Sequence, residues 1–483
     1  MGSLLSTDRS SASSSGPRAN LSTRGARNAA EFADFARKMS LARNVYDERD
    51  NPTGIVILGV ADNGLLRGQL LKFFNAQGNL DLNARELTYA DRIFASQRLL
   101  VALCKLFNEV PDGVPPLTGQ HHHTRLITAL EPEHIIIGSG ATGILDNASW
   151  ALCDAGDGIL LSVPAYNAFW NDFNTRSQVQ IVEVPVSPAD VPLDIAQHVQ
   201  AYEKAYLDAT KKGIDVRVLL LCNPHNPTGA IYPRELVIEL AKFAAKHDLH
   251  LLSDEIYARS CFRTENVPNP PDFHSVLTMD LAREANLNPA KVHVVTSASK
   301  DFSINASAAN GFRLGVFISQ HNKEVRDAVS ALAVVAQSSA PAGALWYHLL
   351  EDGDKFLHWF LTENRRRLSI AYAYVFDWAK HHSLPVAPSN AGHFLLIDFA
   401  SRLASRSAKE EERMTAKLIK NGVFVAPGAQ YHHPIPGWFR LTFSMEPHAL
   451  KVGLSRIEQT LGLQTWIDAQ PDLEFGEQET EKL

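Results

Sequence analysis

Polar side chains suited to acid–base and covalent chemistry follow two apolar runs of this 483-residue sequence. Asp254 and Tyr257 come after LHLLS (249–253), and Lys300 ends the segment SASK after KVHVV (291–295). In an open parallel sheet, ligands bind beyond the carboxyl ends of the strands, so these side chains are expected to meet at one edge. A lysine, a carboxylate and a phenol in one place can bind a carbonyl compound covalently and move protons. Taken singly, Asp254 also fits a helix cap, and Lys300 also fits a solvated side chain.

Two loops after other apolar runs have backbones suited to ligand binding. The run HIII (134–137) leads into GSGATG (138–143), whose free backbone N–H groups suit a phosphate, although such turns more often serve only to reverse the chain. The run VRVLLL (216–221) leads into CNPHNPTG (222–229), in which two X-Pro steps present the amide of Asn226 rigidly. Each loop alone is weak support, and their combination at one sheet edge favours a ligand site.

The elements that position these residues alternate between strands and helices. Seven short β-branched or leucine-rich runs predict buried strands, at 134–137, 158–163, 180–184, 216–221, 249–253, 291–295 and 313–318. Residues 233–247 predict a helix, with Pro233 in its first turn. Leu236, Leu240 and Phe243 share one face of that helix. This alternation predicts an α/β fold with a mostly parallel seven-stranded sheet between helices.

The pattern changes after about residue 345 and predicts a second, smaller α+β domain. A long helical stretch at 354–381 precedes shorter strands at 394–399, 423–427 and 438–443. The predicted organisation is a disordered Ser- and Arg-rich tail (1–28), an N-terminal segment packing with the small domain (29–85), a large domain (86–345), the small domain (346–465) and a loose acidic tail (466–483).

Composition and charge exclude several classes of function. The sequence has 46 Lys plus Arg against 53 Asp plus Glu, and this net charge of -7 argues against a nucleic-acid partner. It has no apolar run of about 18 residues, so no transmembrane segment is predicted. Four scattered cysteines predict reduced thiols, and the adjacent histidines 121–123 cannot converge on one metal ion. A cytoplasmic protein is expected, with N-myristoylation (Gly2 with Ser6) and an organelle transit peptide as alternatives.

The motifs taken together resemble the signature of a known superfamily. In chain order they are GSGATG (138–143), PAY (164–166), NPHNPTG (223–229), SDEIY (253–257), SASK (297–300), GFRLG (311–315) and GWFR (437–440). This set is similar to that of pyridoxal-phosphate (PLP) enzymes of fold type I, the class I/II aminotransferases, over about residues 50–462. The segments ILGVADN (57–63), GVFVAP (422–427) and PGWFRLTFSM (436–445) most resemble the 1-aminocyclopropane-1-carboxylate (ACC) synthase branch. The resemblance implies PLP as cofactor, an amino-acid substrate and a homodimer with shared active sites.

The resemblance also implies roles for individual residues in binding the cofactor ring. Lys300 would form a Schiff base with the cofactor aldehyde and move the Cα proton. Asp254 would pair with the pyridine nitrogen, and Asn226 and Tyr257 would donate to the ring oxygen, which lowers the Schiff-base pKa. Tyr166 would stack on the ring, unless it is an ordinary core tyrosine.

Further residues are implied for the phosphate and the substrate. The phosphate would be bound by Gly140, Ala141, Thr142, Ser297, Arg313 and, from the neighbouring subunit, Tyr89. Arg440 would bind the substrate α-carboxylate, with Asn226 and Asp62 beside the substrate. An arginine in an apolar run such as GWFRLTF is costly to bury unless it meets an anion, which favours this role.

The sequence departs from the family pattern at two places. Arg313 follows Lys300 by 13 positions, roughly five more than the family pattern. Either this loop bulges and still delivers Arg313, or the phosphate site is reshaped, or the gene model contains an error. Asp62 stands where ACC synthases have Glu, which argues against ACC synthesis itself.

Three functions remain open from the sequence. The first is an ACC-synthase-like lyase, which removes the Cα proton from the external aldimine and then expels a sulfur-linked group. The second is an aminotransferase that passes the amino group to a keto acid. The third is a PLP-binding protein without turnover, which the extended loop and Asp62 motivate.

Overall fold

The computed structural model describes residues 21–39, 44–76, 84, 88, 95–110, 125–190, 192–304, 311–351 and 353–476. The chain forms two compact units, residues 1–44 and 45–483. The helix of the first unit is α1 (Thr23–Met39), and near its start the Ser22 hydroxyl oxygen accepts a hydrogen bond from the Gly25 amide at 3.1 Å. Helix α1 thus begins inside the stretch 1–28, for which a disordered tail is predicted from composition. Gly2 and Ser6 lie outside the described residues.

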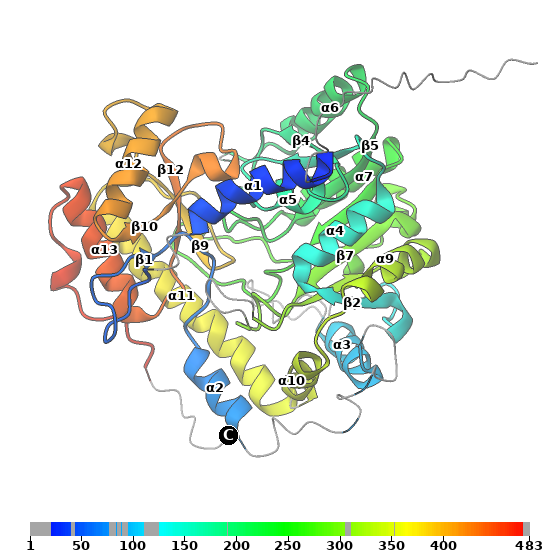
Figure 1. The fold of residues 1–483 in the computed structure, drawn as a ribbon, viewed down its shortest axis with the longest axis horizontal. Coiled ribbons are helices and arrows are strands. Elements are labelled where there is room, and N and C mark those ends of the chain that lie inside the picture. Colours follow the sequence, from blue (N-terminus) through cyan, green and yellow to red (C-terminus); the bar gives the residue numbers. More distant parts are fainter. Residues whose placement is uncertain are drawn as a thin grey trace, which may run out of the picture. The chain divides into compact units, whose positions relative to one another are not determined.

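A seven-stranded sheet forms the centre of the second unit (Figure 1). Its strands are β2 (Ile135–Ser139), β3 (Gly158–Ser162), β4 (Gln180–Val184), β5 (Val216–Cys222), β6 (His250–Asp254), β7 (Val292–Ser297) and β8 (Leu314–Ile318). The strand order is β2-β8-β7-β6-β5-β3-β4, and β8 runs antiparallel to both of its neighbours while the other pairs are parallel. The predicted mostly parallel sheet is confirmed, with each strand within one or two residues of its predicted run.

Helices cover both faces of this sheet. Successive side chains of a strand point to opposite faces, so neighbouring residues of one strand pack against different sets of helices. Leu219 of β5 joins a core with residues of α3, α6, α7 and α10, whereas Leu220 joins one with residues of α4, α5 and α9. The helices are α3 (Gln97–Glu109), α4 (Gly140–Leu152), α5 (Phe169–Asn174), α6 (Ile195–Lys211), α7 (Arg234–Lys246), α8 (Leu281–Ala285), α9 (Lys323–Val335) and α10 (Ala340–Glu351). Burial of both faces explains why the strand runs are almost continuously apolar.

A separate apolar core lies under a smaller antiparallel sheet. Strands β11 (Ala426–Pro427), β12 (Trp438–Thr442) and β9 (Phe394–Asp398) form it, and β1 (Val56–Ile57) pairs with β10 (Val423–Phe424). The helices α11 (His358–His381), α12 (Ala408–Lys420) and α13 (Pro447–Leu461) contribute to this core, whereas α2 (Arg67–Asn75) packs on the core of the large sheet through Leu70. Val56 and Leu58 are buried in this core, so the N-terminal strand packs with C-terminal elements.

The chain after α13 is packed as far as it is described. Ile467 and Leu473 are buried in the same core, and the Glu458 carboxylate accepts hydrogen bonds from the amides of Trp466 and Ile467, both at 3.1 Å. These contacts lie within the stretch 466–483, for which a loose tail is expected from composition. All four cysteines are buried thiols. Within the described ranges, the helices lack the combination of length and apolar character that crossing a membrane requires.

Candidate active site

The carboxyl ends of adjacent strands bring the predicted residues together. Asp254 ends β6 in register with Cys222, which ends β5, and the Asn223 amide donates to the Asp254 backbone oxygen at 2.9 Å. Ser297 ends the next strand, β7, and Lys300 follows it by three residues. The NPHNPTG loop, the acid and the lysine therefore share one sheet edge, as expected from parallel strands.

Lys300 lies in a setting that favours its neutral form. Its Nζ donates a hydrogen bond to the backbone oxygen of Ala61 at 2.6 Å. The pKa of Lys300 is lowered to about 8, mainly by burial; the positive charge of Arg440 acts in the same direction, and Asp62 opposes the change. A larger fraction of the amine is therefore neutral near pH 7 than for an exposed lysine, which is what a nucleophile or base needs.

Asp254 is a buried carboxyl, with 4% of its surface exposed. Burial raises the pKa of Asp254 from 3.8 to about 7, although its Oδ1 accepts a hydrogen bond from the Ile256 amide at 3.3 Å. A cation placed against this carboxyl would restore the charged form. The site therefore holds an acid that is ready to pair with a positively charged ring nitrogen.

The state of Asp254 predicts a pH effect on the stability of the cofactor-free protein. The folded state holds the Asp254 proton up to about pH 7, whereas the unfolded chain loses it near pH 4. Folding stability from this group is therefore present at low pH and is lost as pH rises from about 4 to 7. In urea unfolding, Asp254→Asn should reduce the stability difference between pH 5 and 8 by on the order of 3 kcal/mol. An unchanged difference would contradict the buried, neutral state.

Arg440 is buried in β12 between two aromatic rings. Its guanidinium lies over the rings of Phe394 (4.6 Å) and Tyr431 (4.8 Å), measured to each ring centroid. Nη1 donates to Asn226 Oδ1 at 2.9 Å and Nη2 to the Gly59 backbone oxygen at 2.7 Å, whereas the buried Nε has no hydrogen-bond partner. A buried cation with neutral acceptors and an unused N–H is a site for an anion such as a carboxylate.

The turn at the start of α4 packs tightly against Arg313. Gly140 has a φ of +74°, and a Cβ at this position would collide with the Arg313 guanidinium. A Cβ on Gly315 would likewise collide with the Gly140 backbone. Helix α4 begins here, with Ala141 and Thr142 in its first turn, so its N-terminus and a guanidinium are together and can bind a dianion.

The position of Arg313 bears on the alternatives for the long segment between Lys300 and Arg313. Residues 305–310 lie outside the described residues, but Arg313 follows them and lies against Gly140. The extra residues therefore still deliver the arginine to the predicted phosphate turn. Ser297, the other predicted phosphate ligand, is 1% exposed, and its hydroxyl oxygen accepts a hydrogen bond from the Ser299 amide at 3.1 Å.

The close packing predicts that Gly140→Ala weakens PLP binding. A Cβ there both strains a positive φ and displaces the Arg313 guanidinium, so we expect a loss of affinity of about 10- to 100-fold. Equilibrium titration of the apoprotein with PLP measures it. Gly156→Ala is the matched control, because Gly156 also has a positive φ (+97°) but no atom lies within 4 Å of its added Cβ. An equal loss in both variants would contradict the assignment.

Two tyrosines complete the predicted ring site. Tyr257 is 2% exposed, and its ring packs edge-on against Phe394 with centroids 5.4 Å apart. Tyr166 packs edge-on against Phe169 at 5.2 Å. Burial raises the pKa of Tyr166, and the charges of Asp172 and Asp254 act in the same direction. Both phenols are therefore neutral near pH 7 and can donate hydrogen bonds.

Asp62 lies beside Lys300, but its carboxylate is already engaged. Its Oδ2 accepts from Arg67 Nη2 at 2.7 Å, and its backbone oxygen accepts from the Ser444 hydroxyl at 2.6 Å. The neighbouring Asn63 donates to Asn364 at 2.7 Å. These bonds fix segment 57–63 as one wall of the site.

Some predicted residues cannot be placed. Tyr89 lies outside the described residues, so the homodimer with shared sites stays a prediction. The histidines 121–123 also lie outside them. In the described part of the chain, no three His, Cys, Asp or Glu side chains are grouped to hold a metal ion.

Several residues of the site carry no signal in the sequence. From the sequence, Asp172 would be taken for a surface acid in a short helix. In the structure it is only 7% exposed and its Oδ2 has no hydrogen-bond partner, and burial raises its pKa to about 8. The backbone oxygens of Gly59 and Ala61 bind Arg440 and Lys300 across more than 200 residues of sequence. Such contacts arise only from tertiary packing.

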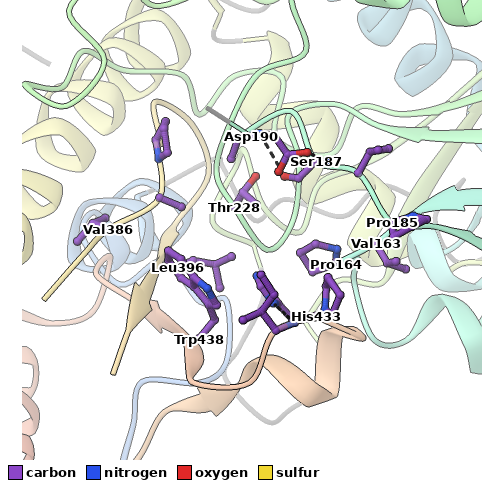
Figure 2. Close-up of a pocket in the computed structure, with 16 residues that line it drawn as sticks. Val163, Pro164, Pro185, Ser187, Asp190, Thr228, Val386, Leu396, His433 and Trp438 are labelled. Carbon is purple, nitrogen blue, oxygen red and sulfur yellow. Dashed lines mark hydrogen bonds between the residues drawn. The ribbon is translucent and has the colours of Figure 1, made fainter. Parts of the chain in front are cut away.

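A separate cavity of about 460 Å³ is lined in part by Leu396 of β9 and Trp438 of β12 (Figure 2). Leu396 in its wall pairs with Arg440 across the antiparallel strands, and Trp438 precedes Arg440 by two residues on the same face. The rest of the wall is mostly proline and aliphatic, and it includes none of the predicted site residues. The cavity is thus distinct from the place where the lysine and the acid meet.

Comparison with known proteins places these features in a family. The family model for class I and II aminotransferases matches residues 116–457. A probable aminotransferase, aclI, of Aspergillus oryzae is 32% identical over 449 residues, covering 92% of this chain and 99% of its own. ACC synthase 6 of Oryza sativa subsp. japonica is 30% identical over 463 residues, covering 91% of this chain and 79% of its own. The fold is similar to Bna3p of Saccharomyces cerevisiae, with a TM-score of 0.70, 19% identity, and coverage of 93% of this chain and 100% of the other.

Proposed function

The chain belongs to the class I and II aminotransferase family, whose members depend on PLP, and on this premise we propose that it is a lyase acting on an α-amino acid. It would remove the Cα proton and then release a sulfur-linked group. The observation that carries the proposal is the meeting of three buried groups in one site, namely the Lys300 amine, the Asp254 carboxyl and the Arg440 guanidinium.

The residues present fit the cofactor. The α4 N-terminus with Gly140 and Arg313 would hold the phosphate, and the Asp254 carboxyl would hold the ring nitrogen. Asn226 and Tyr257 would donate to the ring oxygen, while the remaining predicted ligands are Ala141, Thr142, Tyr166, Ser297 and Tyr89. When bound, PLP supplies an aldehyde that binds amines covalently and a ring that withdraws electrons from the bonds at Cα.

Lys300 and Arg440 would have different roles toward the substrate. The Arg440 guanidinium would bind the α-carboxylate, with the aromatic rings on either side restricting its movement and so orienting Cα. The Lys300 amine, neutral in a substantial fraction of molecules because of burial, would take the Cα proton on its Nζ. Burial of both groups excludes water, which strengthens the carboxylate–guanidinium contact.

The lyase is supported by the likeness to ACC synthases, but ACC itself is a poor candidate product. Asp62 occupies the glutamate position of that branch, its side chain is one methylene shorter, and Arg67 holds its carboxylate. A sulfur-linked group would then leave without ring closure. The names of the fungal relatives favour a second candidate, an aminotransferase, in which Lys300 returns the proton to a different carbon.

The experiment that separates these outcomes is incubation of the purified, PLP-loaded protein with a panel of amino acids and cysteine conjugates. Keto acid, ammonia and free thiol together support the lyase. Amino-group transfer to an added keto acid supports the aminotransferase instead, and a cyclised product supports ACC synthesis. Cofactor binding with none of these products would contradict both proposed reactions.

A further inference from the structure

His393 is a buried histidine that directly precedes β9 and contacts the candidate site. Its side chain is 0% exposed, and its Nε2 lies 3.2 Å from the Ser260 hydroxyl oxygen. Its ring packs edge-on against Tyr257, with centroids 5.4 Å apart and an angle of 85°. The buried Nδ1 has no hydrogen-bond partner. None of the sequence motifs includes this residue.

Hydrogen bonding defines which nitrogen of His393 carries the proton. The Ser260 hydroxyl donates its single proton to Asp301 Oδ1 at 2.7 Å, and Asp301 Oδ2 accepts from the Arg259 amide at 2.9 Å. While the Asp301 carboxyl is ionised, the Ser260 oxygen can then only accept from His393, so for this state we assign the tautomer with hydrogen on Nε2. A chain of hydrogen bonds thus runs from Asp301, the residue after Lys300, to the ring that packs on Tyr257.

The backbone around His393 is held in place by neighbouring strands. The Phe443 amide and the Ser444 hydroxyl donate to its backbone oxygen at 3.0 and 3.3 Å. The next residue, Phe394, packs on both Tyr257 and Arg440. His393 and Phe394 therefore form a rigid pair whose side chains contact Tyr257 from two directions.

We propose that His393 is a positioning residue that holds the Tyr257 ring in place for its hydrogen bond to the cofactor ring oxygen, through Ser260 and Asp301. The inference rests on the proposed function, because it assigns Tyr257 to that oxygen. His393 would act through Tyr257 and would not itself contact the substrate.

The charges around this group keep the imidazole neutral. The pKa of His393 is lowered to about 3, mainly by burial, and the positive charges of Lys300 and Arg440 act in the same direction. Asp301 is the nearest acid, but Ser260 lies between it and the ring. Tyr257, on the other side, faces Arg440, Cys222, Tyr166 and Asp254. His393 therefore stays neutral across the pH range of the test. Burial raises the pKa of Asp301 to about 7, so His393 is a donor to Ser260 above that pH, where Asp301 is ionised.

The test is a visible-absorbance pH titration of the PLP-loaded protein. A phenol that donates to the ring oxygen lowers the midpoint of this titration, so loss of its positioning should raise it. His393→Leu keeps the packing volume but cannot donate to Ser260, and we expect the midpoint to rise by about 0.5 to 1 pH unit. His393→Gln keeps an N–H donor and should restore most of the wild-type value.

Two further variants separate positioning from general damage. In the Tyr257→Phe background, His393→Leu should have no further effect on the midpoint, because the phenol through which it acts is gone. His293→Leu is the matched control, since His293 is equally buried and bonds Ser319 at 3.0 Å away from the site, so it should lower the melting temperature but leave the midpoint unchanged. Equal shifts with and without the phenol, or no shift, would overturn the inference. Absence of a visible band in the wild-type protein would instead contradict the proposed function.

Discussion

Replacing Lys300 with alanine is expected to abolish the visible absorbance band of the bound cofactor and to lower turnover by at least about a thousandfold. Lys300 supplies the amine that would bind the aldehyde and take the Cα proton, and its Nζ donates to the Ala61 backbone oxygen at 2.6 Å. Absorbance spectra and single-turnover rates with an active amino acid measure the two losses. PLP should still bind, because the phosphate turn and Asp254 remain.

The control for this variant is Lys291→Ala. Lys291 precedes β7, nine residues before Lys300, and its ammonium pairs with Asp248 at the protein surface. Its loss should change neither spectrum nor rate. A Lys300→Ala protein with an unchanged spectrum would remove the central assignment of the proposed function.

The second large effect is expected for Arg440→Lys. This substitution should raise KM for the amino acid by about a hundredfold, whereas the affinity for PLP should change by less than about threefold. An ammonium cannot reproduce the two-point contact that a guanidinium makes with a carboxylate. It also cannot donate at once to Asn226, to Gly59 and to a substrate in the same geometry. Steady-state kinetics and PLP titration separate the two affinities.

Arg456→Lys is the control for this substitution. Arg456 also donates to backbone oxygens, those of Gly54 and Gly422, and also lies over an aromatic ring, that of Tyr46 at 5.3 Å. Its replacement should cost stability without changing KM. If Arg440→Lys weakens PLP and amino-acid binding equally, Arg440 is a structural residue and not the carboxylate site.

The site also shows how a reaction can be directed by groups that do not touch the substrate. Arg67 engages Asp62, and the rings of Phe394 and Tyr431 hold Arg440 from both sides. Since the lyase and aminotransferase reactions share the step at Cα, their difference depends on where the proton goes next and what the pocket accommodates. Product analysis of Asp62→Glu would show whether the longer acid changes the product ratio.

Local sequence determined the large sheet of this protein. Apart from the edge strand β4, each strand is a largely apolar and buried run, and some runs end beside a residue whose type indicates the site, as β6 does at Asp254. Parallel strands end at the same edge, so the order of motifs along the chain was enough to predict that Asp254, Asn226 and Lys300 meet. The packing of the stretch after α13 was not predicted, because its acidic composition gives no sign that Ile467 joins an apolar core.

Tertiary structure alone decided the electrostatic state of the site. A lysine and an aspartate in sequence give no indication that burial moves their pKa values to about 8 and about 7, since desolvation depends on what surrounds them. The backbone oxygens that bind Lys300 and Arg440, the buried Asp172, and the chain from Asp301 through Ser260 to His393 come from segments distant in sequence. Residue types and strand order thus fixed which groups are present, whereas three-dimensional packing fixed their charge, their partners and their freedom to move.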